Sequence, residues 1–574
     1  MNHHRFNAQM KHHRQARRET MTTLSMISAT RHVLLEGEVK ARGLYRQSPR
    51  AIRLMFFACL ALVSTATVSA QTYKDIFDFD GTTHGCCPQY PNAMAQGQDG
   101  NLYGTTPTGG SSNVGTIFKI TPTGTLTVLF NFDITHGSTP NGGLILGVDG
   151  NLYGTTEHGG AHAYGNIYKI TPTGTLTVLY DFTGGKDGGN PLAPLVLGTD
   201  GNFYGTSYPG VAFKLSSKGI FTFLNKTPSI SYGPLTQGTD GAFYDATEFG
   251  GTGSLGTVFK VSGKKVTTLF SFDTIHGSFP FGGLVQASDG NFYGTTSAGG
   301  SGNAGTIFKI TPTGTITVLN SFDSAHPVNG YLAYGGLVLG TDGNLYGSTI
   351  FGGSGGNGTL FKITTAGAYT VLSNFDTTRG AGAYATPLQH TNGKIFGLSA
   401  RGGASGKGVA YSLDNGIAPF VALTTTVGLV GKAVGILGGG FTGTTSVKFN
   451  GASANFTVVS DTYLTAKVPA GETGIVSVTT PSRTLLSSKI YRVTPKITSL
   501  TPISGKVGSS VVIAGSGLIH AATITVGGVK VTAFTVNSDK QVTFTVPTGA
   551  KTGKVVLTTA GGKATSSAVF TVTP

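Results

Sequence analysis

One six-residue motif returns along most of this chain and constrains its fold more than any other feature. Its clearest copy is Asp-Gly-Asn-Leu-Tyr-Gly at residues 149–154, and further copies begin at residues 99, 200, 240, 289, 342 and 392. Successive copies start 50, 51, 40, 49, 53 and 50 positions apart. A repeat of this length indicates an architecture in which one supersecondary unit is stacked many times.

The second repeat shows what one unit contains. Four short runs rich in β-branched and aromatic residues follow one another, at residues 142–147, 151–156, 166–170 and 175–182. Asp149 and Gly150 join the first two runs and are typical of a two-residue hairpin, whose central residues need positive φ. The Thr-Pro-Thr-Gly segment before the fourth run suits a tight turn, because proline presets φ and glycine tolerates the left-handed region. Seven units of four antiparallel strands predict an all-β fold that contains a seven-bladed β-propeller.

The two ends of the repeat region complement each other. Residues 72–79 resemble the fourth strand of a unit that has no first three strands before it. The last repeat, residues 387–413, supplies three strands without a clear fourth. We therefore expect residues 72–79 to complete the last unit and to close the ring, because the last unit would otherwise keep an unpaired strand edge.

A shorter period follows Pro419. Residues 420–495 and 496–574 are two copies of a unit with a glycine-rich strand, a hairpin (residues 449–451 and 526–528) and a Val-Pro turn. Many short alternating strands in so few residues predict an immunoglobulin-like sandwich for each copy. The expected domains are a basic leader with a signal peptide (1–70), the propeller (71–417) and two sandwiches (418–495 and 496–574).

The repeated blocks also resemble a known family. Residues 99–106 (DGNLYGTT) and 115–133 (GTIFKITPTGTLTVLFNFD) are similar to the GloVer-type tandem repeats of the choice-of-anchor surface proteins of bacteria, over roughly residues 72–416. The two C-terminal units resemble IPT/TIG domains. These resemblances imply an exported protein whose C-terminal units are spacers or binding modules and bring no catalytic residues. Many members carry a C-terminal anchoring segment, which residues 568–574 do not resemble, so the mode of anchoring is left open.

The first 70 residues predict export. Three arginines precede an apolar run at residues 54–68, and residues 68–70 place small side chains where a signal peptidase would cleave, before Gln71. The run is shorter than the ~20 residues that a membrane-spanning helix needs, so no transmembrane span is expected after cleavage. The true start codon is left open, because Met21 or Met26 would also serve.

Charge is distributed unevenly along the chain. Residues 71–417 hold 16 basic and 19 acidic side chains, whereas residues 418–574 hold 13 and 3, a net charge of +10. Such an asymmetry informs on partners more than on fold. We expect the two C-terminal modules to bind an acidic or envelope polysaccharide; the alternative is that their lysines only keep the modules soluble. No nucleic-acid partner is expected, and the oligomeric state is left open.

Cysteine usage excludes two classes of site. Three cysteines, Cys59, Cys86 and Cys87, are too few for a disulfide framework or for a Cys-based zinc site. Cys86 and Cys87 either form a vicinal disulfide in an oxidising compartment or are ordinary loop residues. The sequence does not choose between these alternatives.

A unique site is expected where the repeats differ, because a residue present in every repeat most simply serves the fold. Strand alternation places the Asp-Gly and Thr-Pro-Thr-Gly turns on one rim of the propeller and the longer, variable loops on the other. Binding residues collect on loops of this kind. Four candidate ligand-binding residues of the variable rim are His84, His276, His326 and Glu248.

A metal site is the sharpest hypothesis for this rim. His136, Glu157, His158 and His162 should gather above one blade. Imidazole and carboxylate ligands suit zinc or another divalent transition metal. The alternatives are ordinary loop histidines or a contact with a metal-free ligand, because the spacing matches no established zinc pattern.

The best interpretation is an exported binding or surface-interaction protein, secreted or at the cell surface, with glycans among the expected ligands. No cofactor and no catalytic residue is assigned. One alternative is a lyase or glycoside hydrolase acting on polysaccharide, since hydrolysis needs two carboxyl groups about 5 to 9.5 Å apart. Glu157 and Glu248 are the two glutamates of residues 71–417, but two blades separate them. The other alternative is a structural stalk or matrix protein.

Overall fold

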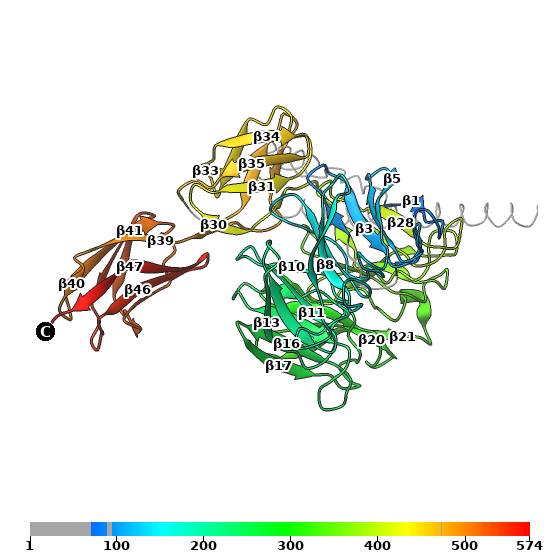
Figure 1. The fold of residues 1–574 in the computed structure, drawn as a ribbon, viewed down its shortest axis with the longest axis horizontal. Coiled ribbons are helices and arrows are strands. Elements are labelled where there is room, and N and C mark those ends of the chain that lie inside the picture. The colour runs from blue at the N-terminus through cyan, green and yellow to red at the C-terminus, as the bar shows by residue number, and fades with distance from the viewer. Residues whose placement is uncertain (1–70, 89–93, 472) are drawn as a thin grey trace, which may run out of the picture. The chain divides into compact units, whose positions relative to one another are not determined.

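The computed structural model describes residues 71–88, 94–471 and 473–574. The predicted leader, signal peptide and Cys59 lie outside these residues. The regular elements of the described residues are β-strands, apart from one 3-10 turn, η1 (Pro327–Asn329). No helix in this part of the chain has the length and apolar character to cross a membrane. The fold is therefore all-β (Figure 1).

Residues 72–414 form seven four-stranded antiparallel sheets, which we number in chain order. The first three sheets consist of β2 (Ala95–Gln96), β3 (Leu102–Thr106), β4 (Thr116–Ile120) and β5 (Leu126–Asn131); β6 (Ile145–Leu146), β7 (Leu152–Thr156), β8 (Asn166–Ile170) and β9 (Leu176–Asp181); and β10 (Val196–Leu197), β11 (Phe203–Ser207), β12 (Val211–Leu215) and β13 (Phe221–Lys226).

The last four sheets repeat the same order. They consist of β14 (Thr236–Gln237), β15 (Phe243–Thr247), β16 (Thr257–Ser262) and β17 (Lys265–Ser271); β18 (Val285–Gln286), β19 (Phe292–Thr296), β20 (Asn303–Ile310) and β21 (Ile316–Asp323); β22 (Val338–Leu339), β23 (Leu345–Ser348), β24 (Thr359–Ile363) and β25 (Tyr369–Asn374); and β26 (Leu388–Gln389), β27 (Ile395–Leu398), β28 (Val409–Asp414) and β1 (Thr72–Asp78).

The seventh sheet confirms the predicted overlap of the two ends. Its outermost strand is β1, which pairs antiparallel with β28 from Thr72 opposite Asp414 to Asp78 opposite Val409. The first strand of each sheet is shorter than predicted, since in the second sheet only Ile145 and Leu146 of residues 142–147 are paired as a strand.

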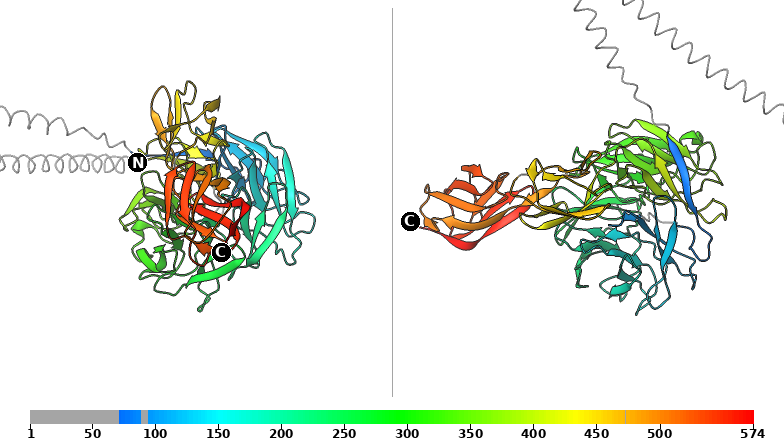
Figure 2. Two further views of the ribbon diagram at one scale, coloured as in Figure 1. Left: turned by 90° about the vertical axis from the view of Figure 1, so that its left-hand side faces the viewer. Right: turned by 90° about the horizontal axis from the view of Figure 1, so that it is seen from above.

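Neighbouring sheets share buried side chains, and the chain of contacts returns to its start. Tyr103 and Phe132 of the first repeat pack with Leu152 and Tyr168 of the second, and equivalent clusters join each following pair of sheets. The seventh and first sheets share one such cluster. Full burial of an aromatic side chain contributes about 1.5–3 kcal/mol, so these seams are the main source of stability. Figure 2 shows the strands gathered around a common centre.

A side-chain hydrogen bond also joins neighbouring sheets, including the seventh and the first. The Gln237 side chain accepts a hydrogen bond from the Thr199 N–H at 2.9 Å, so the fourth sheet is tied to a turn of the third. Equivalent bonds run from Thr239 to Gln286, from Thr341 to Gln389 and, across the closure, from Thr391 to Gln96. The seventh sheet therefore contacts the first as any sheet contacts its neighbour.

Residues 420–494 build a separate pair of sheets. One sheet has the order β29 (Ala422–Leu423), β31 (Ala433–Leu437), β35 (Tyr463–Lys467), β34 (Phe456–Ser460). The other has the order β33 (Ala452–Ser453), β32 (Ser446–Phe449), β36 (Val476–Thr479), β37 (Thr484–Leu486). In addition, β30 (Val427–Leu429) and β38 (Arg492–Thr494) form a parallel pair. Apolar side chains of both sheets share one buried core.

Residues 496–572 build a second pair with its own core. One sheet has the order β39 (Lys496–Thr501), β41 (Ser510–Ser516), β45 (Gln541–Thr545), β44 (Phe534–Ser538), and the other has β40 (Ser504–Gly505), β47 (Gly562–Val572), β46 (Gly553–Thr559), β42 (Thr523–Val526), β43 (Val529–Lys530). Both predicted hairpins are present as two-residue turns, because Phe449 pairs with Ala452 and Val526 pairs with Val529.

Candidate functional site

The ring of sheets has two edges with different chemistry. The turns between first and second strands and between third and fourth strands lie at one edge, which we call the turn edge. The loops between second and third strands and between successive sheets lie at the other, the loop edge. This assignment follows from the antiparallel strand order of each sheet.

At the turn edge, the repeated aspartate holds its own turn together. The Asp149 carboxylate accepts hydrogen bonds from the Asn151 N–H at 3.2 Å, from Asn151 Nδ2 at 2.7 Å and from the Tyr153 hydroxyl at 2.8 Å. The same three bonds recur at Asp99, Asp200, Asp289 and Asp342. These carboxylates therefore serve the fold, as their repetition predicts.

The prediction of a two-residue hairpin at Asp149 and Gly150 was wrong. Leu146 pairs with Leu152, so five residues separate the strands, and Gly150 has positive φ (82°) whereas Asp149 does not. The turn is wider because the Asp149 side chain reaches forward to Asn151 and Tyr153, which a tight type I′ turn would not allow.

The predicted histidines lie at the outer side of the loop edge. His276 Nδ1 lies 2.9 Å from the Asp273 carboxylate, and the imidazole packs edge-on against Phe270 of the outermost strand β17. His84, His136 and His326 pair in the same way with aspartates of their own loops, at 2.7, 2.9 and 2.6 Å. Hydrogen bonds from Thr135 and His136 lower the pKa of Asp133 to about 2. Each pair thus stabilises its own loop, and the pairs do not converge on one ligand.

The predicted metal ligands are not brought together. His136 is engaged by Asp133, and His162 is exposed. His158 Nε2 lies 3.3 Å from Glu157 Oε1, and its Nδ1 lies 2.9 Å from the Asn190 amide. Within the described ranges, no group of three His, Cys, Asp or Glu side chains could hold a metal ion. The two loops are in contact, because the Ser138 N–H donates to the His158 carbonyl at 2.7 Å, but the His136 imidazole pairs with Asp133 and the His158 imidazole with Glu157 and Asn190.

The two glutamates lie at the inner side of the loop edge. Glu157 directly follows β7, and Glu248 directly follows β15, so they occupy the same position in the second and fourth sheets. The Asn141 amide donates to Glu157 Oε2. Burial raises the pKa of Glu157, and burial also raises the pKa of Glu248 against the opposing effect of a hydrogen bond with Tyr232. Both carboxyl groups are therefore partly desolvated, and burial favours their neutral forms.

An arc of four aromatic side chains lies on the same inner side. Tyr232, Phe281, Tyr334 and Tyr384 come from the fourth to the seventh sheets, each just before its first strand. Successive ring centroids are 4.7, 4.5 and 5.6 Å apart. All four side chains are partly exposed. We call these residues the aromatic arc, and the arc with Glu157 and Glu248 the inner mouth.

The backbone segments that carry the arc lie close together. A Cβ atom added to Gly282, which follows Phe281, would lie 2.5 Å from Gly336 Cα of the next sheet. The segments before the first strands are therefore in direct backbone contact across sheets. The sequence carried this signal, because aligning the repeats places the four aromatic residues in one column, where the second and third repeats have Asn141 and Leu192.

One further departure from the repeat lies in the fourth sheet. Asp245 replaces the glycine that ends the motif in the other copies, and its side chain is fully buried. Its carboxyl group accepts from the Ser231 hydroxyl and from the Ala246 N–H, the latter at 2.8 Å. Burial raises the pKa of Asp245 well above its usual range. Burial therefore favours the neutral form of this carboxyl group.

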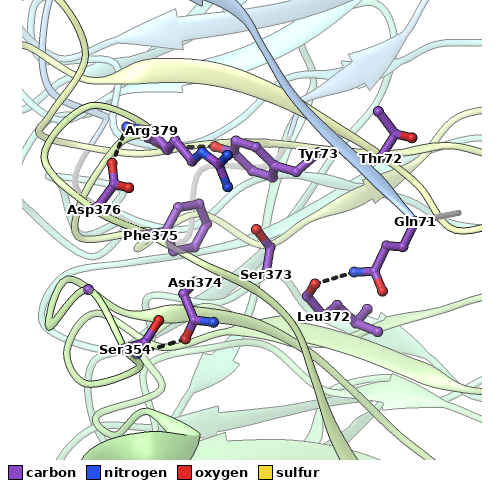
Figure 3. A pocket seen from close by; sticks show the side chains of 11 residues that line it. Gln71, Thr72, Tyr73, Ser354, Leu372, Ser373, Asn374, Phe375, Asp376 and Arg379 are labelled. Atoms are coloured by element: carbon purple, nitrogen blue, oxygen red, sulfur yellow. Dashed lines mark hydrogen bonds between the residues drawn. The ribbon is translucent and has the colours of Figure 1, made fainter. Parts of the chain in front are cut away.

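A cavity of about 590 Å³ opens on the outer side, between β1 and β25 (Figure 3). Its polar groups bond to one another: the Tyr73 hydroxyl donates to the Arg379 carbonyl at 2.6 Å, and the Ser354 N–H donates to Asn374 Oδ1 at 2.9 Å. Cys86 and Cys87, elsewhere on the loop edge, form a disulfide bond. The cavity also holds Asp376 and Arg379, but the Asp376 carboxylate accepts a hydrogen bond from the Arg379 N–H at 2.8 Å and the Arg379 guanidinium lies over the Tyr73 ring. These groups bond within the cavity, so we place the candidate site at the inner mouth.

A family model described as the Gloeobacter/Verrucomicrobia repeat matches residues 62–221 and 231–459, more than half of the chain. The protein belongs to this repeat family. A second model, the IPT/TIG domain, matches residues 495–573, so the last pair of sheets in this member of the repeat family is a TIG domain. No curated protein matches the chain.

Several solved structures are similar to this member of the repeat family. A surface glycan-binding protein from a xyloglucan utilisation locus of Bacteroides uniformis is 25% identical, covers 26% of this chain and 48% of its own, and has a TM-score of 0.14. The extracellular domain of a hybrid two-component system from Bacteroides thetaiotaomicron is 13% identical, covers 82% and 62%, and has a TM-score of 0.41. A fungal alcohol oxidase in complex with copper is 14% identical, covers 71% and 98%, and has a TM-score of 0.42. This chain spans less than two thirds of the length of the first three structures that it matches.

Proposed function

We propose that this protein is an exported carbohydrate-binding protein whose ligand lies at the inner mouth. The aromatic arc is the observation that carries the proposal. Four neighbouring sheets present an aromatic side chain where the second and third present Asn141 and Leu192, so the fold itself does not require aromatic residues at this position. Unrepeated side chains on a rigid scaffold are where binding residues collect.

The chemistry of the inner mouth fits sugars. Aromatic rings carry negative charge on their faces, so they attract the slightly positive C–H groups on the face of a sugar ring. The hydroxyl groups of a sugar then need a few fixed polar partners, as in other small-molecule sites. Glu248, which forms a hydrogen bond with Tyr232, and the tyrosine hydroxyls of the arc supply a carboxyl group and hydroxyl groups beside the rings.

We further infer the organisation that surrounds this site. The seven sheets with their closed series of contacts form a seven-bladed β-propeller over residues 71–417, and residues 418–495 and 496–574 form two immunoglobulin-like modules. The modules carry a net charge of +10, which suits contact with an acidic envelope polymer and a role as spacers. The leader directs this assembly to the cell surface or the medium.

A glycan array and isothermal titration with residues 71–574 test the proposal. We expect binding to at least one oligosaccharide class, and at least tenfold weaker binding for Phe281→Ala combined with Tyr334→Ala, because aromatic contacts dominate such sites. Phe223→Ala is the matched control, since Phe223 is an exposed aromatic residue of the outer strand β13. Equal loss in the control, or no binding by the unmutated protein, would contradict the proposal and would favour a structural stalk.

An enzyme that acts on polysaccharide is the second candidate. The raised pKa values of Glu157 and Glu248 favour it, because a carboxyl group that acts as a general acid must retain its proton near the working pH. A reducing-sugar assay with absorbance detection of unsaturated products, run on every glycan that binds, separates hydrolase, lyase and binding protein. We expect binding without product formation.

A further inference from the structure

A single arginine lies at one end of the aromatic arc. Arg401 follows the seventh sheet's strand β27, and its backbone is fixed by reciprocal hydrogen bonds with Ala381, at 3.0 and 2.7 Å. Its Nη2 atom lies 3.5 Å from the hydroxyl oxygen of Tyr384, the last residue of the arc. The residue is exposed, so the guanidinium group is held beside an aromatic ring with access to solvent.

Arg401 differs from those lysines of the repeats that are paired with an aspartate. Lys119, Lys214 and Lys260 each lie within 4.0 Å of an aspartate of their own sheet. Lys394 pairs with Asp414 at 3.3 Å. No ion pair joins Arg401 to any carboxylate of the residues that the structure describes. Apart from the contact of Nη2 with the Tyr384 hydroxyl, the N–H donors of its guanidinium group are therefore available to an anion from outside.

One carboxyl group lies along the arc. Glu248 forms a hydrogen bond with Tyr232, the first residue of the arc. Burial, followed by the charges of Tyr384 and Glu248, raises the pKa of Tyr334, the third residue. A ligand that lies along the arc thus meets the Glu248 carboxyl group beside Tyr232 and the Arg401 guanidinium group beside Tyr384.

We propose that the inner mouth selects a glycan that carries a carboxylate, namely a hexuronate-containing oligosaccharide, and that Arg401 binds this carboxylate. This inference rests on the proposed function. The planar fork of arginine matches a carboxylate with two parallel hydrogen bonds, and such charge-assisted bonds are stronger than neutral ones. The sugar ring that bears the carboxylate stacks on Tyr384, and the following rings continue toward Tyr334 and Phe281.

Isothermal titration of residues 71–574 with tetragalacturonate and with its fully methyl-esterified form tests this inference. The two probes share one sugar backbone and differ only in the charge of the carboxyl groups. We expect the free acid to bind about tenfold more tightly or better, because a hydrogen bond to a charged group contributes roughly 1.5–3 kcal/mol. Arg401→Gln should remove this preference, and Arg401→Lys, which keeps the charge without the fork, should restore only part of it.

Lys407→Gln is the control for the overall charge, because Lys407 lies in the same sheet and its side chain packs on Gly81. It should leave the preference unchanged. Equal binding of both probes, with no effect of Arg401→Gln, overturns the inference but leaves the carbohydrate-binding function standing. Binding of neither probe, together with a blank glycan array, overturns both. A sulfated galactan tetramer that competes as well as tetragalacturonate overturns the assignment of a carboxylate.

Discussion

The two edges of the ring use the same kinds of residue in opposite ways. At the turn edge, Asp149 and its equivalents accept bonds from the asparagine and tyrosine of their own repeat, so their hydrogen-bonding capacity is used within the turn. At the inner side of the loop edge, Glu157 and Glu248 are partly desolvated, and Arg401 has no ion pair among the described residues. Repetition therefore marks groups that satisfy one another, and departures from it mark groups that are available to a ligand.

The largest effect should come from the turn edge. A Cβ atom added to Gly124 would lie 2.1 Å from the Ile76 carbonyl oxygen of β1, and this residue has a φ of 110°. We expect Gly124→Ala to cost about 3 kcal/mol or more of unfolding free energy, measured with urea, because backbone must move at the ring closure. Gly356→Ala is the matched control on the loop edge, where φ is 73° but nothing lies within 4 Å. It should cost only about 1 kcal/mol, and equal costs would show that the two edges tolerate change equally.

A pH dependence should come from Asp245. Because its pKa is raised in the folded protein, the neutral form stabilises the fold, and this contribution is lost as the pH rises above the usual carboxyl range near about 4. The unfolding free energy should fall by up to about 1.4 kcal/mol per pH unit until the folded-state pKa is reached. Asp245→Asn mimics the neutral carboxyl group and should remove this slope. Urea unfolding between pH 4 and pH 8 tests this prediction. If the unfolding free energy of the unmutated protein and that of Asp245→Asn change with pH in the same way, Asp245 does not ionise on unfolding.

One substitution at each edge compares how much the turn edge and the loop edge contribute to the unfolding free energy. Asp149→Ala leaves the Asn151 and Tyr153 donors without their acceptor and should cost about 1–2 kcal/mol. Glu157→Gln removes a charge that burial disfavours and keeps the bond to Asn141 through the amide oxygen, so stability should change by less than about 0.5 kcal/mol. A larger loss for Glu157→Gln than for Asp149→Ala would reverse the assignment of structural and functional edges.

The smallest effects should come from the outer histidines. His136 and His276 pair with Asp133 and Asp273 at exposed positions, where ion pairs contribute about 0–1 kcal/mol. His136→Ala and His276→Ala should therefore lower stability by about 0.5 kcal/mol and leave glycan affinity unchanged in titration. A loss of affinity would move the site from the inner mouth to the outer loops.

The strands that make up each sheet were largely predictable from the sequence, because they follow from a local pattern of apolar runs and turns. The period and the four apolar runs predicted the four-stranded sheets, and the missing fourth strand of the last repeat predicted the place of β1. The turn at Asp149 was predicted incorrectly because propensity does not reveal where a side chain forms its bonds. The metal ligands were grouped by closeness in sequence, whereas in the structure His136 pairs with Asp133 and Glu157 accepts a hydrogen bond from Asn141.

The site itself needed three-dimensional contacts. Tyr232, Phe281, Tyr334 and Tyr384 are about 50 residues apart, and only the packing of the first strands around a centre makes them neighbours. Arg401 belongs to no sequence motif. It is a candidate ligand-binding residue because no ion pair joins it to a carboxylate of the described residues. An alignment of the repeats as columns would have found the arc, but not the cation beside it.

Strand β1 is the first of the described strands to be synthesised, but its partner β28 is the last strand of the seven sheets, and this order affects how the chain folds. The Ala404 N–H donates to the Asp78 carboxylate across 326 positions. At about 5–20 residues per second, roughly 15–65 s pass between the emergence of the two residues, during which β1 has no partner strand. Pairing over such a distance also slows folding. The seventh sheet consequently cannot be completed until the last repeat has emerged. Strand β1, which completes the seventh sheet of the finished protein, thus also delays the completion of folding.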